Sequence, residues 1–247
     1  MRPITGGPPP PSLTAWTRAE TVAENRHYRS LPTAVKEDIR DQRVRNQHGL
    51  CAYTQRRVGH VIWNGRSTWD AHVEHVVTQK SSFAQGRLSE TVDFGNLVAC
   101  VDRGSTLPYG APARGDSGQP LPVTPFHPNC AVRFLYQATG RIDGTDAAAN
   151  TVIEMLRLNH AELVEHRRAA LAGRGIGVPR NRASGVRRLP SPRISVGNAR
   201  RLAKESRLPN SEGLLPEFSE ALAQVYEAHA LRIEQARRAA GFARRQP

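Results

Sequence analysis

The chain has 247 residues, with 35 Lys and Arg against 22 Asp and Glu, which gives a net charge of +13. This length accommodates one large domain or one domain with appendages, and the excess positive charge favours a polyanionic partner such as nucleic acid. A helix that spans a bilayer needs about 20 apolar residues, and no apolar run of this sequence is that long. The first residues also lack the apolar centre of a signal peptide. We therefore expect a cytoplasmic protein without membrane contact.

The first predicted elements are an arm and a helix. Residues 1–30 include four consecutive prolines and predict an extended N-terminal arm. Residues 31–46 have helix-forming composition, with Val35, Ile39 and Val44 spaced to form one apolar face. We therefore expect this helix to cover a core that the following residues build.

Short strands are expected next. Residues 60–63 and 71–77 have the composition of strands, and the turn-forming pair Asn64-Gly65 lies between them. The apolar residues 94–101 are expected to be buried, and residues 131–136 alternate like a further strand. Helices and strands together predict an α+β fold.

The C-terminal part is expected to be helical on both sides of a linker. Residues 146–172 predict a single helix with a core stripe, and the Pro- and Arg-rich residues 173–213 predict a basic linker. A last helix is expected over residues 216–243, within a C-terminal segment of residues 214–247. Its apolar face would carry Phe218, Leu222, Val225, His229 and Ile233.

The positive charge is concentrated in one part of the chain. Residues 167–207 contain twelve Lys and Arg but a single acid, Glu205. A cationic segment of this composition forms a core poorly and contacts phosphates well. A solvated linker with incidental charge is the alternative interpretation. The candidate nucleic-acid contacts are Arg180, Arg182, Arg187, Arg188, Arg200 and Arg201.

The pair Glu74-His75 is the most informative dipeptide of the sequence. Neighbouring side chains of a strand point to opposite faces, so only one of the two can face the core. Histidine titrates close to physiological pH and suits a general base that activates water, while a carboxylate can hold a divalent cation. A strand with one buried and one exposed polar residue is the plainer interpretation.

Asn96 and a metal ion would complete this chemistry. Phosphodiester cleavage needs an activated water and compensation for the charge that develops on the phosphate. Mg²⁺ or Mn²⁺ supplies the second requirement and prefers oxygen ligands such as the carboxylate of Glu74. The amide of Asn96 would either orient His75 or shape the adjacent loop.

Several motifs in order carry a family resemblance. Val73-Glu74-His75 corresponds to a catalytic "IEH", Phe94-Gly95-Asn96-Leu97-Val98-Ala99-Cys100 to "YxNLLxxC", and the segment that starts at Leu158-Asn159 to "LNLNxxxLxxxR". Over nearly the whole chain this order resembles the HNH endonucleases of bacterial defence islands, the Septu-type and retron-associated nuclease subunits. The resemblance implies a ββα-metal core within residues 31–172, with His75 as general base, Glu74 as metal ligand and Asn96 as orienting residue. It also implies a DNA-cleaving subunit in anti-phage defence that works with an ATPase.

The departures from this family concern its metal sites. Thr54 and Gly110 stand where the family has zinc cysteines, and Ala111 replaces a polar residue of the catalytic metal site. Asp102 or Asp116 could replace the lost catalytic ligand. A rebuilt structural zinc site is one hypothesis, and loss of the zinc with the cysteines as core residues is the other. The rebuilt site would use Cys51, Cys100, His127 and Cys130.

Two other functions remain open from the sequence. The chain could be a degenerate HNH fold that binds nucleic acid or an ATPase partner without cutting, since one metal ligand is missing. It could also be directed to RNA, because a basic segment does not distinguish the sugars. Cleavage of matched DNA and RNA substrates separates these functions.

Overall fold

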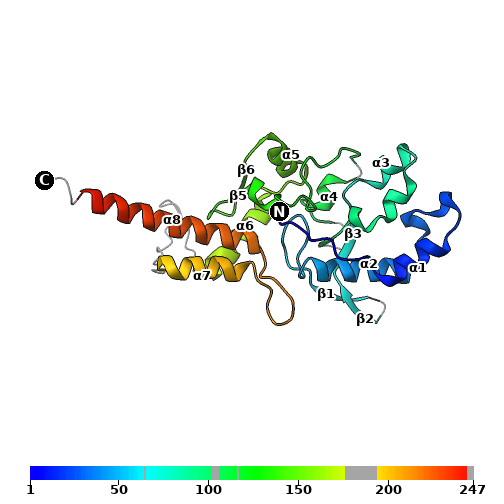
Figure 1. Ribbon diagram of the computed structural model, residues 1–247, viewed down its shortest axis with the longest axis horizontal. Coiled ribbons are helices and arrows are strands. Elements are labelled where there is room, and N and C mark those ends of the chain that lie inside the picture. The colour runs from blue at the N-terminus through cyan, green and yellow to red at the C-terminus, as the bar shows by residue number, and fades with distance from the viewer. Residues whose placement is uncertain (64, 102–105, 116, 176–193, 244–247) are drawn as a thin grey trace.

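The computed structural model describes residues 1–63, 65–101, 106–115, 117–175 and 194–243. Its α-helices are α1 (Pro11–Ala19), α2 (Thr33–Asn46), α3 (Gln79–Ala84), α4 (Ala111–Arg114), α5 (Ala147–Met155), α6 (Ala161–Gly173), α7 (Val196–Ser206) and α8 (Ser219–Ala243). Short 3-10 helices are η1 (Ala23–Asn25), η2 (Tyr28–Ser30), η3 (Leu88–Val92), η4 (Phe94–Asn96) and η5 (Ala131–Arg133). Figure 1 shows a folded body from which α8 projects, with α7 along its side.

The described strands form three antiparallel pairs. They are β1 (His60–Trp63) with β2 (Arg66–Trp69), β3 (Ala71–His75) with β4 (Leu97–Val101), and β5 (Phe134–Tyr136) with β6 (Ile142–Gly144). The mixture of helices and strands confirms the expected α+β class. No described helix is both long enough and apolar enough to cross a membrane.

Helix α2 confirms the helix expected from periodicity. Val35, Ile39 and Val44 are buried along it, and α2 packs on β3 and β4. Gly49 follows the helix with a φ of 73°, a conformation that glycine adopts without strain. The predicted apolar face therefore positions α2 over the strand pair that carries Glu74 and His75.

The pair β3–β4 lies in the core of the body. Its register joins Ala71 to Val101 and His75 to Leu97, and every residue of β4 is buried. The outer edge of β4 meets a side chain instead of a third strand. The Ala99 N–H donates to Gln47 Oε1 at 2.8 Å, and Gln47 Nε2 donates to the Ala99 carbonyl at 2.7 Å.

The expectation of an extended arm over residues 1–30 is wrong for part of that segment. Helix α1 begins at Pro11, the last of the four consecutive prolines, where proline is tolerated because its missing N–H has no helical partner. Leu13 is buried in a cluster that also contains Leu31 and Val35. Burial of this one face stabilises α1 against α2.

The single helix expected over residues 146–172 is two helices. Helix α5 ends at Met155 and α6 begins at Ala161, and Arg157 between them has a φ of 46°. The Asn159 side chain accepts from the Ile142 N–H at 2.9 Å and donates to the Ile142 carbonyl at 2.7 Å. These bonds hold the chain between the helices against β6, because asparagine competes for backbone groups outside a helix.

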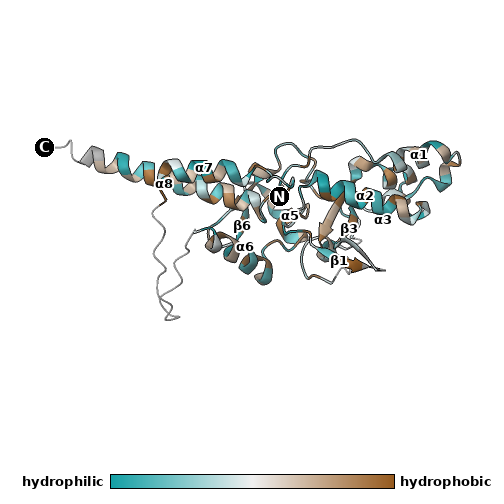
Figure 2. Cartoon of the chain, turned by 90° about the horizontal axis from the view of Figure 1, so that it is seen from below, coloured by the Kyte–Doolittle hydropathy of each residue, from teal (hydrophilic) through white to brown (hydrophobic). Residues whose placement is uncertain are grey.

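The expected basic linker also contains a helix. Residues 176–193 lie outside the described residues, but Ser195 caps α7 by accepting from the Asn198 N–H. Ala199 and Ala203 are buried on α7, which packs along α8, and Figure 2 shows the two helices side by side. Small side chains on one face let the helix axes approach, so tertiary packing makes this cationic segment helical.

Helix α8 confirms the last expected helix with a shorter start, because Phe218 before it has a φ of 55°. Leu222 and Val225 are buried, whereas His229 and Ile233 of the expected stripe are half-buried. The apolar face of α8 therefore contacts the protein mainly through its first half.

Candidate functional site

Strand β3 places Glu74 and His75 on different faces, as period-two geometry requires. Glu74 is half-buried and His75 is 5% exposed. Both residues line a pocket of about 340 Å³, which His72, Gln79 and Ala111 also line. The structure therefore brings the two expected site residues to one concave surface, with the histidine on the core side.

His75 is held by a carbonyl group and an aromatic ring. Its Nε2 lies 2.9 Å from the Thr91 carbonyl oxygen, and the Tyr28 ring meets it edge-on with ring centroids 4.7 Å apart. A carbonyl oxygen only accepts, so Nε2 carries the proton of this bond and a neutral ring has its lone pair on Nδ1. The bond to Thr91 and the contact with Tyr28 therefore fix the orientation of the His75 ring.

Asn96 shapes the loop that follows β3. Its Oδ1 accepts from the Val77 N–H at 2.6 Å, and its Nδ2 donates to the carbonyls of Val77 and Glu90, each at 3.1 Å. The Asn96 carbonyl accepts from the Val76 N–H at 2.9 Å. Of the two roles that the sequence leaves open, these bonds support loop shaping.

Arg114 of α4 is a site residue that sequence reasoning missed. Its buried guanidinium donates to the carbonyls of His75 at 3.1 Å, Val76 at 2.7 Å and Gln119 at 3.2 Å. Its Nη1 also lies 3.5 Å from Glu74 Oε1. A permanent positive charge therefore lies beside the carboxylate, and α4 is fixed to the end of β3. The 39 positions that separate Arg114 from His75 leave no local signal for this contact.

The described residues do not form a complete site for a hard divalent cation. Such ions bind carboxylate and carbonyl oxygens together with water, and Glu74 is the only carboxylate among the described residues that line the pocket. Ala111 and Pro112 line it without a side-chain donor atom. Across the described residues there is no group of three or more His, Cys, Asp or Glu side chains suited to a metal. Asp102 and Asp116 lie outside the described residues.

Cys51 and Cys100 lie together behind this site. The Cys100 thiol donates to the Cys51 sulfur, which also accepts from the hydroxyl and backbone of Thr54 and from the backbone of Val101. Burial raises the pKa of Cys51, but these hydrogen bonds outweigh it and lower that pKa to about 5. Burial holds the pKa of Cys100 well above its ordinary value.

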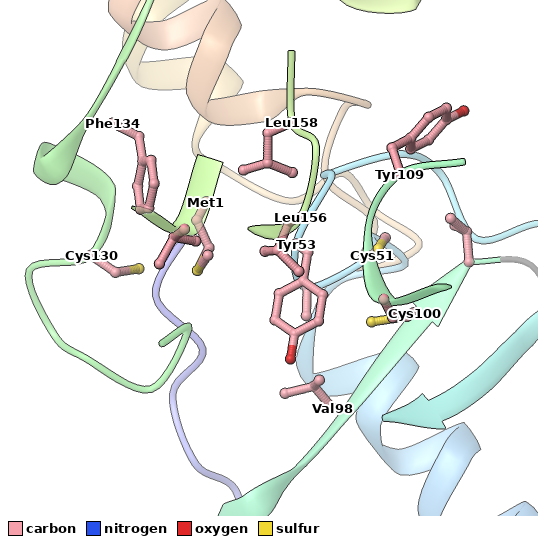
Figure 3. Packing of buried hydrophobic residues seen from close by; sticks show 14 of the residues in the cluster. Met1, Cys51, Tyr53, Val98, Cys100, Tyr109, Cys130, Phe134, Leu156 and Leu158 are labelled. Atoms are coloured by element: carbon pink, nitrogen blue, oxygen red, sulfur yellow. The ribbon is translucent and has the colours of Figure 1, made fainter. Parts of the chain in front are cut away.

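The four residues of the expected zinc site do not converge. Cys130 lies beside Met1 and Phe134, in another part of the core from Cys51 and Cys100 (Figure 3). His127 is exposed on a loop. A tetrahedral zinc site needs four ligand atoms around one point, so the set Cys51, Cys100, His127 and Cys130 is not assembled in this structure.

The positions that replace zinc cysteines of the resembled family do lie together. Thr54 bonds to the sulfur of Cys51, and a Cβ on Gly110 would lie 3.1 Å from Thr54 Cγ2. Gly110 has a φ of 76°, which disfavours any other side chain there. Cys51, Cys100, Thr54 and Gly110 therefore surround a common region, in which hydrogen bonds and packing connect them.

The candidate nucleic-acid contacts are only partly described. Arg200 and Arg201 lie on α7 with exposed side chains, and they pair with Glu234 at 2.8 Å and Glu205 at 2.7 Å. Exposed pairs of this kind contribute little to stability and separate readily for a better partner. The other four, Arg180, Arg182, Arg187 and Arg188, lie outside the described residues.

Comparisons with known proteins do not assign the chain to a class. No protein-family model matches it, and no curated protein is similar to it. The function is therefore argued from the geometry around Glu74 and His75 and from the distribution of charge.

Proposed function

We propose that this chain is a nucleic-acid-binding subunit of HNH type that does not cleave phosphodiester bonds and that serves anti-phage defence beside an ATPase. The observation that carries the proposal is the ion pair between Arg114 and Glu74. The guanidinium compensates the charge of the only carboxylate among the described residues of the pocket, and it repels a second cation near that carboxylate. Glu74 is thereby engaged by the protein itself.

Two features support the HNH part of this proposal. The antiparallel pair β3–β4 precedes α4 in the chain, which is the order of a ββα core. Cys51, Thr54, Cys100 and Gly110 also lie near one another, at the four positions that the resemblance assigns to zinc. The net charge of +13 supports a polyanionic ligand, bound through the phosphate backbone without sequence readout.

A metal-dependent endonuclease is the second candidate function, and one observation favours it. Glu74 and His75 line the same pocket, and the bond from Nε2 to the Thr91 carbonyl fixes the orientation of the His75 ring. A base oriented by a third group is the arrangement that activates nucleophiles in many hydrolases. In this function Glu74 would bind Mg²⁺ or Mn²⁺ after separating from Arg114.

The test is supercoiled-plasmid cleavage with Mg²⁺, Mn²⁺ or EDTA, both alone and with the proposed ATPase partner and ATP added. Binding to matched DNA and RNA is measured in parallel. We expect intact plasmid in every arm and binding that weakens steeply as salt rises, because cationic side chains displace counterions. His75→Ala is compared with His127→Ala, an exposed histidine of a loop. Metal-dependent nicking that only His75→Ala abolishes would establish the endonuclease instead.

A further inference from the structure

A cavity of about 560 Å³ lies between the N-terminal segment, α1, α2 and η4. Much of its wall is apolar and includes Leu13, Phe94 and Phe126. It shares no described lining residue with the pocket beside Glu74. Cavities that bind small molecules have this size, with apolar walls and a few polar groups, so this cavity is a candidate binding site in its own right.

The unusual polar group of this wall is Arg43 of α2, which is fully buried. Its Nη2 donates to the Phe94 carbonyl, and its guanidinium carbon lies 3.4 Å from the centroid of the Phe94 ring. Its Nε and Nη1 have no hydrogen-bond partner among the described residues. A buried donor that lacks an acceptor is costly, above all when it is charged, so an acceptor from outside the chain would relieve this cost.

The charges around the cavity favour an anion. Burial lowers the pKa of Arg43 to about 10, which the Asp93 carboxylate partly offsets, so the guanidinium is charged at neutral pH. Asp93 also lines the cavity, but its Oδ1 accepts from the Gly95 N–H at 2.8 Å. Arg18 of α1 is exposed and lines the cavity as a second cation. Two arginines and one aspartate are thus the charged residues of the described wall, and their sum matches a monoanion.

We propose that this cavity binds a small monocarboxylate with an aromatic or branched apolar body. The apolar body would lie against Leu13 and the phenylalanine rings, and the carboxylate would accept from the Arg43 nitrogens that have no partner within the described chain. Guanidinium groups bind carboxylates through strong charge-assisted hydrogen bonds. The half-buried Phe126 ring, whose centroid lies 5.3 Å from the guanidinium carbon, would turn aside to admit the carboxylate.

The wall of the cavity is continuous with the segment that shapes the candidate site. Val92 and Phe94 of the wall lie in the chain between Thr91, whose carbonyl holds His75, and Asn96, which bonds to the loop after β3. A ligand packed on this segment would stabilise the folded protein. Bound carboxylate should therefore raise the melting temperature by mass action.

The experiment titrates naphthalene-2-carboxylate into the purified full-length protein, followed by calorimetry and by the melting temperature. We expect saturable binding of one molecule per chain and a melting temperature that rises with ligand concentration. The uncharged 2-naphthamide keeps the apolar body and should bind about tenfold more weakly, because hydrogen bonds to an ionised acceptor are the stronger ones. Inorganic phosphate, an anion without an apolar body, should not displace the carboxylate.

Thr14→Trp tests the location, because Thr14 is an exposed residue of α1 that lines the cavity. Its indole would fill part of the cavity and should weaken binding by about tenfold. Ala15→Trp is the matched control, since Ala15 is the exposed neighbour of Thr14 but is not among the described residues of the wall. That variant should bind as the unmutated chain does, and Arg43→Met should remove the preference for carboxylate over carboxamide.

The comparison of the two naphthyl ligands on the unmutated chain gives an answer even if Arg43→Met fails to fold. Equal binding of carboxylate and carboxamide, displacement by phosphate, equal losses in Thr14→Trp and Ala15→Trp, or no binding at all would each overturn the proposal. No nucleic acid is present in this experiment, so its outcome is independent of the function proposed above.

Discussion

Buried arginines are the residues that sequence patterns placed least well. Arg43, Arg114 and Arg167 each donate to main-chain carbonyl groups inside the protein. Burial lowers the pKa of both Arg43 and Arg167 to about 10, so both stay charged at neutral pH. A hydropathy pattern assigns arginine to the surface, and only the folded chain shows which carbonyl groups require a donor.

A substitution of Arg167 would measure how much a buried arginine contributes to the free energy of unfolding. Its Nε donates to Gly140 and its Nη2 to Leu158, each at 2.5 Å. Arg167→Met keeps the volume but leaves both carbonyl groups without this donor, so we expect a loss of roughly 3 kcal/mol in the free energy of unfolding. Urea denaturation measures this loss. Arg168→Met, at a half-buried neighbour paired with the exposed Glu165, should change stability by less than about 0.5 kcal/mol.

The pocket beside Glu74 allows a gain-of-function test at the same scale. Ala111 lines this pocket and stands where the resembled family has a polar residue. We expect Ala111→Asp to bind Mn²⁺, measured by titration calorimetry, because it adds a second carboxylate. Glu74→Gln in the same background should abolish that binding. Equally tight Mn²⁺ binding to the unmutated chain through Glu74 would contradict the proposal that Arg114 keeps Glu74 from binding a metal ion.

Part of the site could be predicted at this scale. Period-two geometry was sufficient to place Glu74 and His75 on opposite faces, and the asparagine downstream indicated a closing loop. The Thr91 carbonyl that holds His75 is a backbone atom and has no signature in the sequence. Arg114 was missed for a related reason, since its partners are mostly carbonyl groups of distant residues.

At the scale of elements, most segments with regular apolar spacing were predicted correctly, and segments without it were missed. Helix α2 and strands β1 and β3 were expected from their patterns, whereas the residues of β4 were expected only to be buried. Strand β2 was not, because Arg66-Ser67-Thr68-Trp69 has little apolar alternation and is a strand through its pairing with β1. Helix α7 was hidden within a segment whose average composition resembles a linker.

The break between α5 and α6 depends on the side chain of Asn159. Asn159→Ala removes its two bonds to Ile142, and we expect the free energy of unfolding to fall by about 1–2 kcal/mol, since both backbone groups lose a partner. Chemical denaturation followed by circular dichroism provides the measurement. Asn25→Ala, on an exposed turn of η1, is the control, and an equal loss there would contradict a specific role for Asn159.

At the scale of the whole molecule, the two halves of α8 have different surroundings. Its first half packs against the body and α7, whereas residues 235–240 are exposed and include Arg237 and Arg238. Figure 1 shows this end of α8 projecting beyond α7. The projecting end therefore contributes positive charge to the surface and little to the core.

Truncation after Glu234 separates these contributions. We expect an unchanged melting temperature, because residues 235–240, which the truncation removes, are exposed. Affinity for DNA should fall, and the plot of log affinity against log salt should become shallower by roughly 2–4, as fewer counterions are released. Full-length protein with Arg237 and Arg238 replaced by Gln should show about half of this change. Unaltered binding by both variants would exclude α8 from the interface.

The side chain of Gln47 also affects how copies of this protein meet in solution. A strand with an open edge can pair with the same strand of another molecule, and such pairing is a route to aggregation. The outer edge of β4 offers the backbone groups of Ala99, and the carboxamide of Gln47 satisfies both of them. Together with the Ala52 N–H, which also donates to the Ala99 carbonyl at 3.1 Å, this amide side chain occupies the edge of β4, and we expect it to hinder self-association of an apolar segment.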